Sequence, residues 1–346
     1  MPRNIPRRVL LRTNNLHCRL GAVQRRFFSH SDHVKRAPPS PPETPPWHHD
    51  PRKVAAATAL ATGVAAIAVR LKYGERAPFS GRTHLALLSH KEARERDEAE
   101  FAKFKKEHAS RILGPRHPDT VRVRGIALDM VRAAHHGLAV RQLHVAKKKQ
   151  AKPCSDELQW MDGLHWEVIV VRDDQINGDS FLRDGKKGAE TFAGAGKIVV
   201  YTALLHPQRS EDEIAFTLAH EVGHVIARHS SGIIHWLTSI IEKVPILFLL
   251  VLPFMFPVLA PFKRRCELEA DHIGILLLAA AGVDPVIAVQ VMQENAMLRG
   301  ESTLQECLSY FRFQSSAKKR WQFLSQPKVF LEALELYKQV TSHAQG

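Results

Sequence analysis

Cysteine is scarce in this chain of 346 residues, which contains only four. They are Cys18, Cys154, Cys266 and Cys307, and no two of them have the Cys-x-x-Cys spacing of structural zinc sites. Four scattered cysteines do not form a disulfide framework either. The cysteine content therefore argues against a closed structural zinc site and against a small fold that depends on disulfides.

Acidic residues are missing from the N-terminal segment, where Asp32 is the first. Residues 1–28 contain seven arginines and no acid, a composition typical of a mitochondrial transit peptide. The sequence Arg26-Phe27-Phe28-Ser29 resembles a mitochondrial processing site with cleavage after Phe28. A basic tail that binds an anionic surface is the alternative. We favour a transit peptide at residues 1–28.

The chain also lacks the motifs that would make its net charge of +14 a sign of nucleic-acid binding. Half of that excess comes from the seven N-terminal arginines. No pattern of stacking aromatic residues accompanies the rest, and aromatic residues make up only 7% of the chain. The glycine-rich stretch 185–196 is not followed by Gly-Lys-Ser/Thr, so it is no phosphate-binding loop. We therefore predict no nucleic-acid partner.

One apolar run near the N-terminus is nearly long enough to cross a bilayer. Residues 54–69 are uncharged and rich in alanine, but a bilayer needs roughly 20 residues. Leu71 and Tyr73 extend the run if the flanking basic side chains snorkel. A proline-rich linker at 29–53 precedes it. We favour a transmembrane helix at 54–73, and hence a lipid bilayer as a partner, over a buried helix. Basic residues flank both ends and leave its orientation open.

A second apolar run, residues 244–262, contains no charge. Its prolines at positions 245, 253, 257 and 261 are expected to break a simple helix. The run belongs to a segment, residues 233–262, for which two interpretations remain open. We favour a membrane-dipping or lipid-facing hairpin, and the alternative is a buried cap over the functional site.

The strongest motif is His220-Glu221-Val222-Gly223-His224, an H-E-x-x-H sequence. A capping box at Ser210 and Glu213 and an apolar periodicity predict that it lies on one helix. The two histidines at i and i+4 then share a face and can bind one Zn²⁺, with the glutamate beside the metal's open position. The motif could also occur by chance on a solvated face. However, its neighbours are apolar, and these polar side chains are costly there without partners.

A catalytic zinc needs a third protein ligand and one free position. A second helix is predicted at about Arg264–Ala281, and on it Glu267, Asp271 and Gly274 share one face. We assign Glu267 as the third ligand. We expect Asp271 to accept the second N–H of a ligating histidine, and Gly274 to let the two helices pack closely. His272 is expected to point away from the metal.

The remaining pattern predicts an α+β fold that is mainly helical. Residues 92–108 read as a solvated helix, and residues 121–138 as a core helix beside the metal helices. Residues 166–171 and 197–201 read as strands. We interpret the second as an edge strand, placed to bind an extended peptide by strand addition. Beyond Gly282 we expect an all-helical cover.

The H-E-x-x-H sequence together with Glu267-x-Glu269-Ala270-Asp271 resembles the HtpX and CAAX-prenyl-endopeptidase family of gluzincin metallopeptidases. The similarity is greatest to its mitochondrial inner-membrane members, whose activity overlaps that of the m-AAA protease, and its character is that of a plant member. It extends from about Arg82 to Val340. Further stretches that carry it are residues 82–85, 117–124, 167–171 and 196–201.

The resemblance implies a gluzincin-type metallopeptidase domain at residues 82–346 that binds one Zn²⁺. It implies that His220, His224 and Glu267 are the metal ligands and that Glu221 is catalytic. It also implies a zinc endopeptidase of the mitochondrial inner membrane, with its protease domain in the intermembrane space. Such an enzyme hydrolyses misfolded or regulatory membrane proteins in protein quality control, and it could be a homo-oligomer.

Two departures from the family pattern support an alternative. Members usually have Thr-His-Pro before a basic Lys-Lys-Arg, but here residues 313–317 read Phe-Gln-Ser-Ser-Ala before Lys318-Lys319-Arg320. The segment expected at the substrate edge, residues 189–196, also differs from the usual sequence. The alternative is a weakly active or inactive chaperone or scaffold in the same membrane. A basic membrane-surface adaptor is a third, weaker reading.

Overall fold

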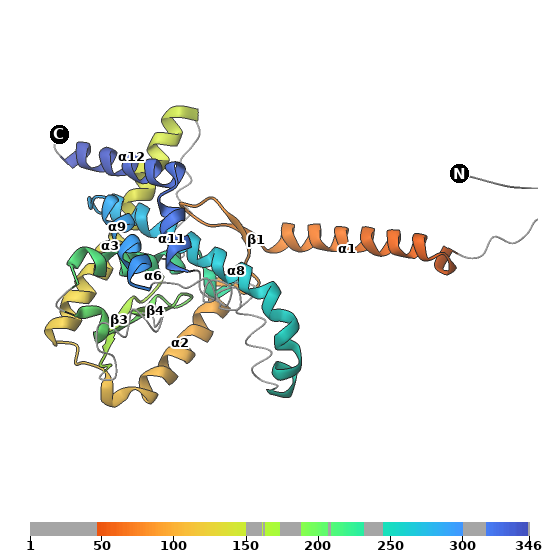
Figure 1. The fold of residues 1–346 in the computed structure, drawn as a ribbon, viewed down its shortest axis with the longest axis horizontal. Helices are drawn as coiled ribbons and strands as arrows, with labels where there is room; N and C mark the ends of the chain where they lie inside the picture. Colours follow the sequence, from red (N-terminus) through yellow and green to blue (C-terminus); the bar gives the residue numbers. More distant parts are fainter. Residues whose placement is uncertain are drawn as a thin grey trace, which may run out of the picture. The chain divides into compact units, whose positions relative to one another are not determined.

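The computed structural model describes residues 47–149, 161, 163–173, 188–206, 209–231, 245–299 and 316–344. The transit peptide and most of the linker expected from the sequence lie outside these residues. Residue contacts divide the chain into two units, Met1–Ala59 and Leu60–Gly346. The second unit is mainly helical with two small sheets (Figure 1). This agrees with the predicted α+β class.

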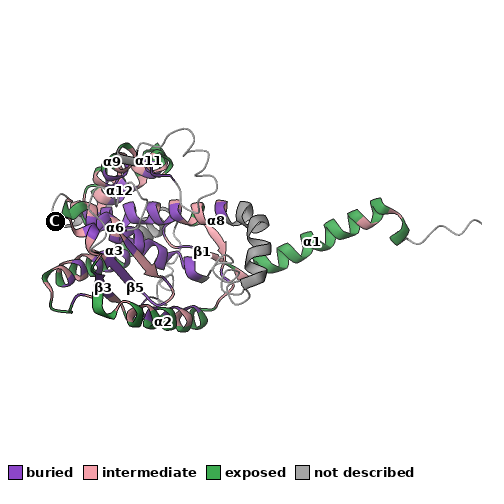
Figure 2. Ribbon diagram, turned by 60° about the horizontal axis from the view of Figure 1, so that its bottom comes forward, coloured by how far each residue is buried: buried purple, intermediate pink, exposed green. Residues whose placement is uncertain are grey.

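Helix α1, Pro51–Tyr73, contains the apolar run that the sequence singled out. None of its residues is buried, so it is coloured as exposed along nearly its whole length in Figure 2. Among the described residues it is the one helix with the length and hydropathy of a bilayer span. The helix begins at a proline, which fits the first helical turn because its missing N–H would have no partner there. The membrane span itself stays a prediction.

A β-hairpin follows α1 directly, and the sequence analysis did not predict it. Strand β1, Gly74–Arg76, pairs antiparallel with β2, Thr83–Leu85. Gly74 allows the join, because a Cβ at this position would lie 2.2 Å from the carbonyl oxygen of Arg70. The chain therefore passes from helix to strand without a linker.

Helix α2, His90–Glu107, is the solvated helix expected from the mixed charges. It begins with a capping box between Ser89 and Glu92. Only Ala93, Asp97 and Phe101 are buried, and they form one narrow face. That face packs on the three-stranded sheet, where Phe101 joins a small apolar cluster with strand residues.

The three-stranded sheet has the order β3-β5-β4. Strands β3, Glu167–Val171, and β5, Lys197–Tyr201, confirm the two strands predicted from sequence, and they are parallel to each other. Strand β4, Ala189–Phe192, is antiparallel to β5 and lies within the glycine-rich stretch 185–196, in the segment that the family resemblance placed at the substrate edge. The prediction that β5 is an edge strand is wrong, because β5 is paired on both sides. Its run of buried residues is typical of a central strand.

Helix α3, Pro118–Lys149, includes the predicted core helix and extends it at both ends. Its buried stripe contains Val123, Ala127, Met130 and Ala134, which recur at spacings of four, three and four residues. The stripe faces α6, α8 and β3.

Helices α6, Glu211–Ile226, and α8, Pro245–Ala280, form the centre of the unit. In both ribbon views they lie between the sheet with α2 on one side and the C-terminal helices on the other (Figures 1 and 2). The capping box at Ser210 begins α6 as predicted. The expectation that prolines break the segment 244–262 is wrong, since α8 continues through positions 253, 257 and 261. Proline removes one backbone donor and strains a helix locally, but it does not have to end the helix.

The C-terminal part of the second unit is helical, as predicted. It contains α9, Val286–Arg299, α11, Ala317–Leu324, and α12, Pro327–Ala344. Helices α11 and α12 pack against α8, and α9 packs against α11 and α6. The missing Thr-His-Pro stretch of the family pattern lies largely outside the described residues. Short 3-10 turns occupy Trp47–His49, Ala109–Arg111, Thr202–Leu205 and His229–Ser231.

Candidate metal centre

Three buried side chains converge between α6 and α8. His220 and His224 come from α6 and Glu267 comes from α8. Their potential ligand atoms all lie within 4.8 Å of one another. The two Nε2 atoms are 3.1 Å apart, and the Glu267 carboxylate oxygens lie 3.6 Å from His220 Nε2 and 3.8 Å from His224 Nε2.

These separations fit a zinc ion. Tetrahedral zinc with bonds of about 2.1 Å holds neighbouring ligand atoms about 3.4 Å apart. Two imidazoles and one carboxylate are also a ligand set found in catalytic sites, which keep a fourth position open for water or substrate. Of the described residues, this is the one group of three or more histidine, cysteine or acidic side chains that is compact enough for a metal.

Two glycines let the helices approach closely enough to bring the carboxylate to the imidazoles. A Cβ on Gly223 would lie 2.8 Å from the carbonyl oxygen of Ala270, and a Cβ on Gly274 would lie 3.2 Å from the backbone nitrogen of His220. Gly274 therefore has the packing role predicted for it from sequence. The equivalent role of Gly223, inside the H-E-x-x-H motif, was not predicted.

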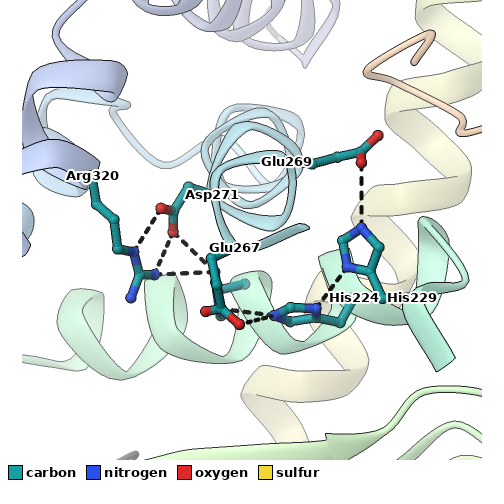
Figure 3. Close-up of polar contacts among 7 residues, drawn as sticks. His224, His229, Glu267, Glu269, Asp271 and Arg320 are labelled. Carbon is teal, nitrogen blue, oxygen red and sulfur yellow. Dashed lines mark hydrogen bonds and ion pairs between the residues drawn. The ribbon is translucent and has the colours of Figure 1, made fainter. Parts of the chain in front are cut away.

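His220 is held by a buried ion pair. The Oδ1 atom of Asp271 lies 2.9 Å from Nδ1 of His220, the contact expected from the helical spacing. Arg320 of α11 donates to both carboxylate oxygens of Asp271, with a distance of 2.7 Å from Nε to Oδ2 (Figure 3). Burial favours the protonated form of Asp271, but the Arg320 guanidinium outweighs it and keeps the pKa of this carboxyl below its usual value. An ionised Asp271 accepts the Nδ1–H proton and leaves Nε2 of His220 free for the metal.

His224 has a different set of partners. Its Nδ1 atom lies 2.7 Å from Nδ1 of His229, and Nε2 of His229 lies 3.3 Å from Oε2 of Glu269 (Figure 3). Burial opposes a charge on His229, but Cys266 and Glu269 outweigh it and raise the pKa of His229 to about 9 when no metal is bound to His224. A divalent cation on His224 would lower that pKa, because like charges repel. Glu269 also accepts hydrogen bonds from Ser80 and Arg82, at 2.5 Å and 2.8 Å.

A cavity of about 570 Å³ opens beside the three convergent side chains. Glu221, which follows His220 on α6, lines it and is itself buried. The β4 residues Glu190–Phe192 line another wall. The turn after β4 is held against α2, because Asp97 accepts a 2.6 Å hydrogen bond from the backbone N–H of Gly194. An edge strand therefore borders the cavity, and it is β4 rather than β5.

The structure thus brings together His220, Glu221, His224, Glu267 and Asp271, the five residues that sequence spacing had selected. His272 contacts Glu332 at 3.0 Å instead and does not line the cavity, as expected.

Three nearby residues were missed by the sequence analysis. Arg320, His229 and Glu269 each lie near the metal ligands through contacts across the fold. Glu269 belongs to the same Glu-x-Glu-Ala-Asp stretch as Glu267, which carries the family resemblance. The sequence pattern did not predict which residues Glu269 contacts.

Comparison with known proteins gives consistent results. Residues 147–328 match the sequence model of the family described as Peptidase family M48. The chain is 30% identical over 359 aligned residues to a protein of Arabidopsis thaliana named Mitochondrial metalloendopeptidase OMA1, and the match covers 87% of this chain and 70% of the relative.

Two relatives from a fungus and an animal are also named as mitochondrial OMA1 metalloendopeptidases. One from Saccharomyces cerevisiae is 27% identical over 217 residues, covering 57% of this chain and 53% of the relative. One from Homo sapiens is 23% identical over 258 residues, covering 68% of this chain and 43% of the relative. The chain therefore spans about half of the length of these two relatives.

Proposed function

Because the chain belongs to peptidase family M48, and within it to the mitochondrial OMA1 metalloendopeptidases, we propose that His220, His224 and Glu267 hold its zinc and that Glu221 is its general base. The protein is a mitochondrial zinc metalloendopeptidase. The observation that carries the residue assignment is the convergence of two imidazoles and one carboxylate from two helices on a single point. The family membership does not favour the inactive scaffold as an alternative.

When bound, zinc lowers the pKa of a bound water towards about 7 and polarises the scissile carbonyl. The protein's own residues do the rest. Glu221 accepts the proton of the attacking water and passes it to the nitrogen of the leaving amine. Asp271 and Arg320 keep His220 in the tautomer that offers Nε2 to the metal.

The substrate is an extended peptide that adds to the free edge of β4. This proposal is supported by the strand order, in which no described strand pairs with β4 on the side away from β5, and by the β4 residues that line the cavity. In strand addition the main-chain hydrogen bonds provide affinity with little dependence on sequence. Such a mode suits an enzyme that degrades misfolded proteins as well as one that cuts selected regulatory proteins.

We further propose that the enzyme is anchored in the inner membrane by α1 and acts there on membrane proteins from the intermembrane space. The support is the unburied, apolar α1 together with the arginine-rich, acid-free segment at residues 1–28. The apolar segment at 233–262, part of which forms the first turns of α8, is proposed to contact the bilayer as well.

The Glu221→Gln variant tests the residue assignment. It keeps the size of the side chain but removes the base, so we expect turnover of a fluorogenic peptide to fall by at least about a thousand-fold while zinc stays bound. Metal analysis and a chelation-and-restoration experiment on the wild-type protein accompany the assay. Unchanged turnover in the variant with one equivalent of zinc still present would show that another residue is the base.

A further inference from the structure

We infer that His229 and Glu269 are positioning residues for the zinc ligand His224, and that this chain of contacts ends on the hairpin that follows α1. The inference deepens the proposed function, because it takes His224 as a zinc ligand. It assigns a role to two buried side chains that the proposed hydrolysis does not use. It also makes the segment at residues 80–82 part of the metal centre.

The first contact is between two imidazole rings. A metal on Nε2 of His224 leaves the ring proton on Nδ1, which then has to be donated. Nδ1 of His229 lies within hydrogen-bond distance of this atom, at 2.7 Å. A contact between two Nδ1 atoms holds a single proton, and with that proton on His224 the Nδ1 atom of His229 is the acceptor. His229 must then carry its own proton on Nε2.

The second contact fixes that tautomer. Nε2 of His229 points to Oε2 of Glu269 at 3.3 Å, and both residues are buried (Figure 3). Glu269 is only 5% exposed, so its negative charge needs compensation from within the protein. A His224–His229–Glu269 chain with one proton per link satisfies all three side chains.

The hairpin supplies the compensation. Ser80 donates to Oε1 of Glu269, and Arg82 donates to Oε2 at 2.8 Å. These two residues lie in the connection between β1 and β2, on the segment that directly follows α1. The negative charge on which His229 depends is therefore held by the hairpin.

Backbone geometry at the end of α6 supports a specific role for His229. Arg228 has a φ of +52°, a left-handed conformation that is unusual for a residue with a side chain. Its guanidinium is held by Glu75 of β1 and by the carbonyl oxygen of Leu88, 3.1 Å away. The turn that brings His229 back towards His224 is thus also fixed by the hairpin.

The two ligating histidines are supported in different ways. His220 is backed by a carboxylate and an arginine that come from α8 and α11. His224 is backed by a neutral imidazole and then by a carboxylate. The support of His224 alone extends to the N-terminal hairpin. Loss of that support should therefore loosen the metal without unfolding the α6–α8 pair.

The test compares His229→Leu with His229→Gln in the full-length protein. Leucine removes both polar contacts, so zinc affinity, measured by competition with a chelator of known affinity, should fall about 10- to 100-fold. Glutamine can accept from His224 and donate to Glu269, so it should restore most of the affinity. The d–d absorption bands of the Co²⁺-substituted protein should shift in the leucine variant and return in the glutamine variant.

His272→Leu is the matched control. Like His229, His272 of α8 pairs with a glutamate, Glu332, at 3.0 Å, but it does not line the cavity. Its variant should bind zinc as the wild type does. Thermal unfolding of the metal-free forms shows whether His229→Leu and His272→Leu cost similar stability, which separates a metal-specific effect from general damage.

A second pair of variants tests the hairpin. Ser80→Ala combined with Arg82→Gln removes both donors to Glu269 and should speed zinc loss to a chelator several-fold. Arg122→Gln breaks an ion pair of comparable length with Glu211, away from the cavity, and should have no effect on zinc. Equal zinc affinity and an unchanged Co²⁺ spectrum in His229→Leu would overturn the inference. The proposed zinc site fails separately if His220→Ala still binds zinc.

Discussion

Asp271 is completely buried, and a single arginine provides its counter-charge. Arg320 contacts both oxygens of Asp271 and also approaches Nδ1 of His220 at 3.2 Å. The orientation of a metal ligand thus depends on a residue 49 positions further along the chain from Asp271. Without the arginine, the buried carboxylate would be driven towards its neutral form, which binds the Nδ1–H of His220 less strongly.

We predict that Arg320→Gln weakens zinc binding about 10- to 100-fold and lowers the free energy of unfolding by about 3 kcal/mol. The zinc affinity follows from chelator competition, and the stability follows from urea denaturation of the metal-free protein. Arg132→Gln is the control, because its pair with Asp129 is exposed and should contribute less than about 1 kcal/mol. Identical zinc affinity in wild type and Arg320→Gln would refute the role of Arg320.

The residues that were predictable from sequence are those whose geometry is set within one helix. The positions of His220 and His224, and of Glu267 and Asp271, follow from helical spacing alone. Arg320 and the Ser80–Glu269 contact could not be found in this way, because their partners lie 49 and 189 residues away. No local pattern records which distant segments the fold brings together.

The crossing of α6 and α8 sets the distance between the imidazoles and the carboxylate. At Gly223 the neighbouring helix leaves no room for a side chain, since the Ala270 carbonyl oxygen would lie 2.8 Å from a Cβ. An added methyl group has to push the two helices apart or shift a backbone. The separation of Glu267 from the histidines changes with it.

Gly223→Ala is therefore expected to destabilise the protein by about 1–3 kcal/mol and to weaken zinc binding. Gly125→Ala is a matched control on α3, where a Cβ would meet nothing within 4 Å. That substitution should instead stabilise the protein by up to about 1 kcal/mol, because alanine favours a helix over glycine. Urea denaturation and zinc titration of both variants check the expectation, and equal stabilities would contradict it.

We propose that the substrate peptide binds along the outer edge of β4. Tyr201 donates its N–H to the carbonyl oxygen of Gly188, and antiparallel pairs alternate in their bonding. By this alternation Glu190 bonds inward to Val199, whereas Thr191, opposite Ile198, directs its backbone N–H outward. Thr191 is thus placed to donate to a bound peptide without loss to the sheet.

Replacing Thr191 by proline removes that outward donor, and we expect kcat/KM for an extended peptide to fall at least about ten-fold with zinc still bound. Thr191→Val keeps the backbone N–H and should retain most of the activity. Steady-state kinetics with one peptide substrate and metal analysis of both variants give the comparison. If the two variants have equal kcat/KM, peptides do not bind along β4.

The residue pattern predicted two strands of the three-stranded sheet but did not predict β4, its edge strand beside the cavity. The valine-rich stretches of β3 and β5 are long enough to be recognised, and both strands are present. Strand β4 has only four residues and lies within the glycine-rich stretch 185–196, so the residue pattern did not predict a strand there, and only the family resemblance placed residues 189–196 at the substrate edge. Which strand lies at an edge depends on pairing between segments, and the pairing of β4 with β5 left β5 in the centre.

At the scale of the whole molecule, the described residues combine one exposed apolar helix with a metallopeptidase unit. The side chains of α1 have no packing partners that would bury them, which is costly in water for large apolar residues but favourable in lipid. Leu60, Val64 and Ile67 are each more than half exposed. The membrane anchor is consistent with this surface and remains a prediction.

We predict that the wild-type protein in isolated mitochondria resists alkaline extraction and that Val64→Lys makes it extractable, since a lysine near the middle of a span costs about 3 kcal/mol. Leu331→Lys is the control, because Leu331 of α12 is as exposed as Val64 and lies outside the proposed span. A protease added after rupture of the outer membrane should digest the catalytic unit. Extraction of the wild type at alkaline pH, or protection of the catalytic unit, would contradict the proposed topology.

Helix α1 joins the hairpin directly, and this limits where insertions and deletions can be tolerated. A residue inserted in α1 rotates the preceding part of that helix by about 100° but leaves the pairing of β1 with β2 as it is. A residue inserted within β1 slips that pairing by one position, and a residue inserted in the connection before Arg82 displaces Arg82 or Ser80 from Glu269. Insertions and deletions among homologues should therefore accumulate on the N-terminal side of Tyr73 and be rare in the nine residues that follow it.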